Sequence, residues 1–85
     1  KLTAEEEEFI STLVSSLPPV IARKEVNRYL GGMVASQTLS NADSAGMGPE
    51  VAYRVGRTIA YRTESLVRWV VDRFGVVKVA GLKSL

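Results

Sequence analysis

The stretch GGMVASQTLSNADSAGMGP, from Gly31 to Pro49, decides how this sequence folds. With four of the chain's seven glycines and no Lys or Arg, it has the composition of a flexible linker. Its apolar residues argue against a linker, because Leu39 and Ala42 fall on one side of a helix. Polar residues fall on another side of that helix at helical spacing, namely Gln37, Ser40, Asn41 and Ser44. We therefore predict a turn followed by a short helix.

This helix is expected over about residues 36–45. Ser36 is the expected N-cap, since a hydroxyl there can accept hydrogen bonds from the first-turn amides. Gly46 is expected to end the helix, and Gly48-Pro49 to turn the chain away. Because the segment consists of poor helix formers, it needs support from neighbouring elements.

Two helices are expected before this stretch. The first has Thr3 and Glu6 as a capping box and ends at Pro18-Pro19. The second is expected over about residues 23–30, with Gly31 as its left-handed end. Its inward side is predicted to be Ala22, Val26, Tyr29 and Leu30, and its outward side Arg23, Lys24, Asn27 and Arg28.

The period changes after Pro49. In VAYRVGRTIAYR, residues 51–62, two β-rich runs flank Gly56-Arg57, which predicts a hairpin with a two-residue type II′ turn. Thr63 is expected to cap a last helix that ends at Gly75. Its predicted core side consists of Leu66, Trp69, Val70 and Phe74. Residues 76–85 are compatible with a short strand or with a frayed tail.

The composition narrows the classes of function. Without Cys or His, the chain lacks disulfides, thiolate metal sites and the commonest general base. It also lacks a phosphate-cradling glycine motif and paired catalytic groups, so we expect no enzyme, no cofactor, no metal and no small-molecule substrate. No apolar run approaches the roughly 18 residues of a membrane helix, and the missing Cys favours a cytoplasmic setting.

The net charge of +2 is unevenly distributed along the chain. Four glutamates occupy residues 5–8, whereas most Lys and Arg lie between residues 23 and 73. An acidic end on a basic body is compatible with an anionic partner for the body. The helix expected over residues 36–45 has no Lys or Arg and carries Asp43, which predicts a weaker attraction to phosphate.

A helix, a turn, a polar helix and a hairpin follow one another in the order of a helix-turn-helix unit with a wing. Gln and Asn can bond adenine in the major groove, and Ser and Thr can contact bases or phosphates. Arginines on a hairpin can reach phosphates or the minor groove. We therefore predict double-stranded DNA as the partner and these DNA-binding residues: Ser36, Gln37, Thr38, Ser40, Asn41, Arg54, Arg57 and Arg62.

Several short motifs occur together between residues 22 and 70: Lys24-Glu25-Val26, Ser36, Thr38-Leu39, Asn41, Gly46, Gly48-Pro49, Gly56-Arg57, Tyr61, Leu66 and Trp69. In this combination the segment resembles the excisionase-like, AlpA-type DNA-binding proteins of phages and mobile elements. These proteins are similar in turn to the MerR-type winged helix-turn-helix. The resemblance implies sequence-specific DNA binding by a bacterial or phage-encoded, nucleoid-associated protein. Its expected role is excision in DNA recombination or regulation of transcription.

The expected fold is mainly α with a small β-hairpin, a winged helix-turn-helix of the MerR or excisionase-like kind. The domain covers residues 20–75 and is followed by a tail over residues 76–85. An extra N-terminal helix within residues 1–19 packs on the domain or mediates formation of a homodimer. The alternative is a protein–protein interaction module on the same scaffold, without DNA binding. Its partner surface would include Val67 and Val71, unless the core takes up these side chains.

Overall fold

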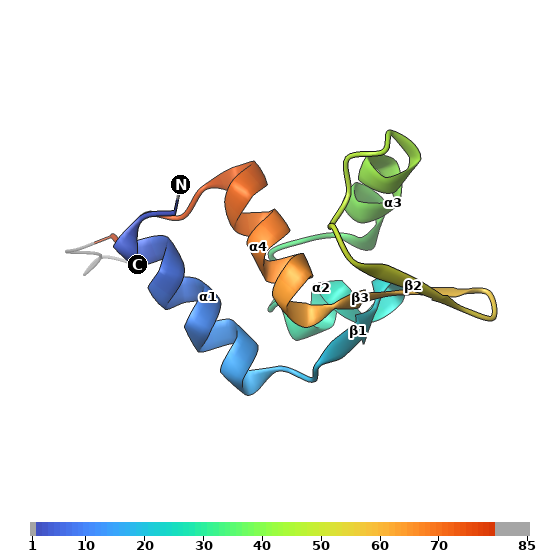
Figure 1. The fold of residues 1–85 in the computed structure, drawn as a ribbon, viewed down its shortest axis with the longest axis horizontal. Coiled ribbons are helices and arrows are strands. Elements are labelled where there is room, and N and C mark those ends of the chain that lie inside the picture. The colour runs from blue at the N-terminus through green and yellow to red at the C-terminus, as the bar shows by residue number, and fades with distance from the viewer. Residues whose placement is uncertain (1, 80–85) are drawn as a thin grey trace.

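A computed structural model describes residues 2–79 of the chain. Within this range lie four α-helices, one 3₁₀ helix and a three-stranded antiparallel sheet (Figure 1). The helices are α1 (Ala4–Ser16), η1 (Arg23–Glu25), α2 (Val26–Tyr29), α3 (Ser36–Ser44) and α4 (Thr63–Phe74), and the strands are β1 (Val20–Ala22), β2 (Ala52–Val55) and β3 (Thr58–Arg62). Helices α1 and α4 lie side by side at one end, and α3 and the β2–β3 hairpin lie at the other. No helix in the described range is long and apolar enough to cross a membrane.

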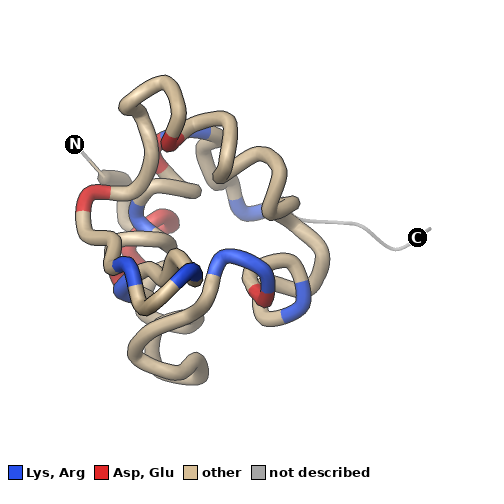
Figure 2. Tube along the Cα trace, turned by 90° about the vertical axis from the view of Figure 1, so that its right-hand side faces the viewer, with Lys and Arg blue, Asp and Glu red and all other residues tan. Residues whose placement is uncertain are grey.

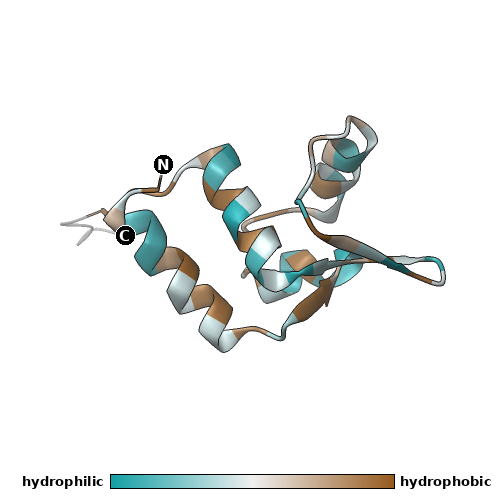
Figure 3. Cartoon of the chain, in the orientation of Figure 1, coloured by the Kyte–Doolittle hydropathy of each residue, from teal (hydrophilic) through white to brown (hydrophobic). Residues whose placement is uncertain are grey.

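Helix α1 begins with the predicted capping box. The Thr3 hydroxyl accepts a hydrogen bond of 3.1 Å from the Glu6 amide, and the Glu6 carboxylate accepts one of 2.9 Å from the Thr3 amide. The apolar side of α1 packs on α4 (brown in Figure 3). Ile10, Val67 and Val71 form a small core between the two helices. Val67 and Val71 are thus taken up by the core and do not form an outer face.

The sheet has one strand more than the two that the sequence predicts. Its order is β1-β3-β2, with Ile21 of β1 opposite Tyr61 of β3. Strand β1 has three residues, which is too short for a periodic pattern, and Val20-Ile21 after two prolines is the one local sign of extended chain. Because η1 follows β1 directly, this strand attaches the start of the second helix to the hairpin.

The predicted hairpin and its turn are confirmed. Val55 lies opposite Thr58, which leaves Gly56-Arg57 as a two-residue turn. Gly56 has a φ of 64°, and no residue other than glycine has a positive φ in the described range. A positive φ at the first turn residue and a negative one at the second define the type II′ turn.

Two predicted N-caps are wrong by one residue. The N-cap of α3 is Ala35, and Ser36 is the first helical residue. The N-cap of α4 is Arg62, and Thr63 is the first helical residue. The buried Thr63 hydroxyl donates a hydrogen bond to the carbonyl oxygen of Pro18, so it fastens α4 to the chain before β1 instead of capping the helix.

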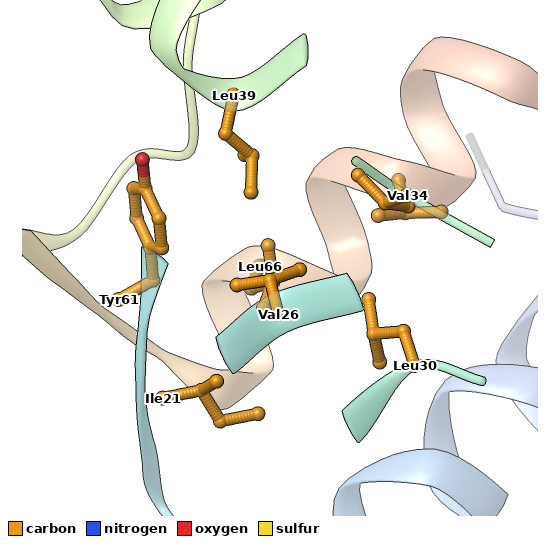
Figure 4. Packing of buried hydrophobic residues seen from close by; sticks show 8 residues of the cluster. Ile21, Val26, Leu30, Val34, Leu39, Tyr61 and Leu66 are labelled. Carbon is orange, nitrogen blue, oxygen red and sulfur yellow. The ribbon is translucent and has the colours of Figure 1, made fainter. Parts of the chain in front are cut away.

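The main core joins the second helix, α3, the sheet and α4 (Figure 4). It consists of Ile21, Val26, Leu30, Val34, Leu39, Tyr61, Leu66 and Val70. Leu39 from α3 points into this core, and the Tyr61 hydroxyl points toward α3. Gly31, with a φ of 63°, ends the second helix as predicted, although the first turn of that helix is the 3₁₀ helix η1.

Two aromatic residues expected in the core are exposed. Tyr29 lies beneath the guanidinium group of Arg28, 4.7 Å from the ring centroid. Phe74 packs edge-on against Trp69, which is itself partly buried. A neighbouring Arg covers each exposed ring, which lowers the cost of leaving it outside the core. Residues 76–79 form no helix or strand, and the prediction for residues 80–85 lies outside the described range.

Candidate nucleic-acid interface

A groove of about 280 Å³ lies between α3 and the β2–β3 hairpin. It is lined by Arg23, Lys24, Ser36, Gln37, Ser40, Arg57, Thr58 and Ile59. Of these described lining residues, three are cationic and none is acidic. Figure 2 looks onto this end of the molecule and shows several Lys and Arg positions on it. The groove thus combines positive charge with polar side chains from two separate elements.

The polar side of α3 is exposed, as its spacing predicts. Gln37 and Asn41 are exposed, and the Gln37 Nε2 donates a hydrogen bond of 2.9 Å to Asn41 Oδ1. Ser40 lies one turn from Gln37 on the side that faces the groove and is half-buried. The N-cap residue Ala35 makes no side-chain hydrogen bond to the first amides of α3, which adjoin the groove.

The hairpin brings two of its three arginines to the groove side. Arg57 occupies the exposed turn and lines the groove directly. Arg54 lies opposite Ile59, so both side chains are on the face of the sheet that borders the groove. Arg62 lies opposite Val20 and lines a separate hollow beside α1, away from the groove.

Thr38 also lies apart from the groove-facing residues. In a helix with 3.6 residues per turn, Thr38 projects from a different side of α3 than Ser36 and Ser40. It is half-buried and does not line the groove. The structure therefore gathers Ser36, Gln37, Ser40 and Arg57 around one groove, places Arg54 and Asn41 beside it, and leaves Thr38 and Arg62 elsewhere.

Sequence reasoning did not include Arg23 and Lys24 in the candidate site. Both lie in η1, and both line the groove opposite the start of α3. The only signal for them in the sequence is that two adjacent cationic residues begin the helix that precedes the turn. This signal alone does not distinguish a ligand-facing pair from ordinary surface charge, because the groove exists only once β1 has placed η1 beside the hairpin.

Arg23 also belongs to a partly buried polar cluster with Asp43 and Tyr61, which we call the Asp43 cluster. Asp43 Oδ2 accepts one hydrogen bond of 2.5 Å from Arg23 Nη2 and another of 2.5 Å from the Tyr61 hydroxyl. The Arg23 Nε donates to the Tyr61 hydroxyl oxygen at 2.9 Å. The side chains of Arg23 and Asp43 are 26% and 25% exposed, so the pair is partly shielded from solvent.

Two members of the Asp43 cluster, Arg23 and Tyr61, have raised pKa values. The hydrogen bonds with Tyr61 and Asp43 raise the pKa of Arg23 above its ordinary value. Burial, with the hydrogen bond to Asp43, raises the pKa of Tyr61 to about 12. Arg23 therefore stays cationic and Tyr61 neutral at physiological pH. The charge of Asp43 is paired within the protein, whereas the sequence alone suggests a free acid on the helix.

In the part of the chain that the structure describes, no three or more Asp or Glu side chains gather closely enough to hold a metal ion. Comparisons with protein-family models, with curated proteins and with solved structures found no match.

Proposed function

We propose that this chain is a sequence-specific double-stranded DNA-binding protein that uses a winged helix-turn-helix. In this proposal α3 is the recognition helix, the second helix and the turn at Gly31 complete the helix-turn-helix, and the β2–β3 hairpin is the wing. The observation that carries the proposal is the groove, because it sets Lys24 and Arg57, together with the Asp43-paired Arg23, beside the exposed polar side of a short helix.

The recognition helix supplies the contacts to bases. B-DNA admits a helix into its major groove, where amide side chains bond adenine and hydroxyl groups contact either bases or phosphates. Gln37 and Asn41 are exposed on the side of α3 that would face the bases. Their mutual hydrogen bond leaves Gln37 Oε1 as an acceptor and Asn41 Nδ2 as a donor for the DNA.

The groove supplies the contacts to the backbone. Lys24 and Arg57 approach it from η1 and from the wing tip, so a phosphate between them would meet cations on two sides. The first amides of α3, to which the N-cap Ala35 makes no side-chain hydrogen bond, adjoin the same space and favour a negative charge. Such contacts fix the register of the helix on the duplex and provide most of the salt-dependent affinity.

The resemblance of residues 22–70 to excisionase-like proteins adds a biological role to this proposal. The chain would act on a defined DNA site as an excision factor or as a small regulator of transcription, without catalysing a reaction. Its N-terminal helix α1 packs on α4, at the opposite end of the molecule from the groove (Figure 1).

Binding to fluorescently labelled random duplex DNA, measured by anisotropy at about 50 and 200 mM salt, tests the proposal. We expect binding at low salt that weakens steeply at high salt and weakens further in Arg57→Ala. The matched control Arg62→Ala removes an equal charge outside the groove and should bind like the wild type. An absence of binding at tens of micromolar protein at low salt would refute the proposal. The scaffold would then be a candidate for a protein partner instead.

A further inference from the structure

Asp43 occupies a position that the local physics of a DNA-binding helix disfavours. It is the penultimate residue of α3, where the negative end of the helix dipole opposes a carboxylate. It is also the one acidic residue of this helix, next to a proposed DNA surface. Because the charge of Asp43 is unfavourable both at this end of the helix and beside DNA, we expect this residue to have another role in the fold.

The hydrogen bonds of Asp43 show what that role is. Its carboxylate on α3 accepts from Arg23 in η1 and from Tyr61 in β3. It therefore joins the three elements that enclose the groove: the recognition helix, the start of the second helix and a wing strand.

The apolar contacts of helix α3 are limited to one side. It buries two of its nine residues, Leu39 and Ala42. These apolar contacts hold the helix against the core but are not directional. Hydrogen bonds are directional, so the Asp43 cluster adds a specific constraint on how α3 is oriented toward the wing. The loop after α3 has its own anchor, a 2.8 Å hydrogen bond from Trp69 Nε1 to the Met47 carbonyl oxygen.

Gly48 provides the space for the Asp43 carboxylate. A Cβ atom at Gly48 would overlap Asp43 Oδ1, and Gly48 does not have a positive φ that would itself call for glycine. The lack of a side chain at this position therefore serves packing against Asp43. Gly48 thus allows the Asp43 carboxylate to take the position in which it bonds Arg23 and Tyr61.

We propose that Asp43 is a positioning residue that strengthens DNA binding, although its own charge repels phosphate. It acts by orienting α3 so that Gln37 and Ser40 face the groove together with Arg57. This inference rests on the proposed DNA-binding function. It goes further by assigning part of the affinity to a residue that acts through the orientation of α3 and not through its own contact with DNA.

Simple electrostatics predicts the opposite effect of removing Asp43, so the experiment can distinguish the two explanations. Removal of a carboxylate near DNA should tighten binding, and the released Arg23 would add a phosphate contact. Positioning predicts weaker binding after the same change. Tyr61 provides an independent probe, because Tyr61→Phe changes no charge and the side chain is 0% exposed and cannot contact DNA.

The experiment measures the Kd of the full chain for a duplex selected from a random pool, at several salt concentrations. The proteins are the wild type, Asp43→Ala, Asp43→Asn, Tyr61→Phe and the control Glu50→Ala, which removes an exposed acid from the same α3–β2 segment. We expect Asp43→Ala and Tyr61→Phe to bind about fivefold more weakly, the loss expected from one good hydrogen bond, with an unchanged salt slope. Asp43→Asn should lose less, because its amide oxygen still accepts a hydrogen bond. Glu50→Ala should bind like the wild type or slightly more tightly.

Equal or tighter binding by Asp43→Ala and Asp43→Asn overturns the inference while leaving DNA binding intact. A steeper salt slope in these variants also overturns it, since Asp43 would then only mask Arg23. If the wild type does not bind, both the proposed function and the inference fail. Circular dichroism confirms that each variant is folded, and Tyr61→Phe with Asp43→Asn decides the question if Asp43→Ala unfolds.

Discussion

Gly48 and Asp43 are packed so closely that a methyl group on Gly48 would overlap the Asp43 Oδ1 atom. The two residues belong to the same segment, in which α3 ends and the chain turns toward β2. Through Asp43, this contact reaches Arg23 and Tyr61 on two other elements. The backbone of the α3–β2 turn is therefore coupled to the geometry of the groove.

Gly48→Ala should lower the free energy of unfolding by about 1–3 kcal/mol, because an added group is forced against a well-packed neighbour. Urea denaturation measures the change. In an Asp43→Ala background the overlapping atom is gone, so the same Gly48→Ala change should cost clearly less. An equal cost in both backgrounds would show that the Asp43 carboxylate is not what limits the space at Gly48.

Tyr61 should make stability sensitive to alkaline pH. Burial raises its pKa from 10.0 to about 12, so above pH 10 the unfolded chain releases this proton before the folded chain does. The contribution is complete below pH 10 and declines as pH rises toward 12, at no more than about 1.4 kcal/mol per pH unit. Urea denaturation of the wild type and Tyr61→Phe at about pH 8 and pH 11 isolates this contribution from other titrating groups. A stability difference between the two proteins that is the same at both pH values would contradict the prediction.

Ile10→Ala should destabilise the whole domain. Ile10 is 4% exposed and packs against Val67 and Val71 of α4, so truncation leaves a cavity that costs about 2–4 kcal/mol. Thermal or urea unfolding measures the loss, and the exposed neighbour Ser11→Ala serves as the control. If Ile10→Ala is as stable as Ser11→Ala, α1 is a dispensable addition and not part of the folding unit.

Lys24→Ala should reduce the salt dependence of DNA binding. Lys24 lines the groove, and loss of one phosphate contact lowers the slope of log K against log salt by about 0.9. Arg68→Ala on α4 is the matched control, since Arg68 pairs with Glu64 outside the groove. Parallel salt titrations of the two variants provide the comparison. Identical slopes for Lys24→Ala, Arg68→Ala and the wild type would remove Lys24 from the interface.

The parts of the fold that the sequence predicts well are those with strong local chemistry. The Thr3–Glu6 capping box, the left-handed Gly31 and the Gly56-Arg57 turn each depend on residues adjacent in the chain. Helix α3 also follows from its own spacing, with Leu39 and Ala42 buried.

The parts that the sequence does not predict depend on distant partners. Strand β1 exists because β3 pairs with it, and its three residues have no period of their own. The Thr63 hydroxyl donates its hydrogen bond to the carbonyl oxygen of Pro18, 45 positions away. This long-range bond replaces the local capping role that the sequence predicts.

The same distinction holds for the candidate site. Exposure of Gln37 and Asn41 follows from helical spacing, and the position of Arg57 follows from the hairpin turn. The inclusion of Arg23 and Lys24 follows only from the packing of η1 beside the hairpin. The pairing of Arg23 with Asp43 joins residues that lie 20 positions apart on two elements, so no local pattern predicts it.

The measurement that tests the central claim most directly is a titration of the ¹⁵N-labelled chain with duplex DNA, followed by backbone amide NMR. Direct binding through the groove predicts the largest chemical-shift changes at Lys24, at residues 36–40 and at Arg57, with small changes along α1. The largest changes on α1 and the outer side of α4, or no changes at low salt, would contradict the claim that α3 and the hairpin form a DNA-binding surface.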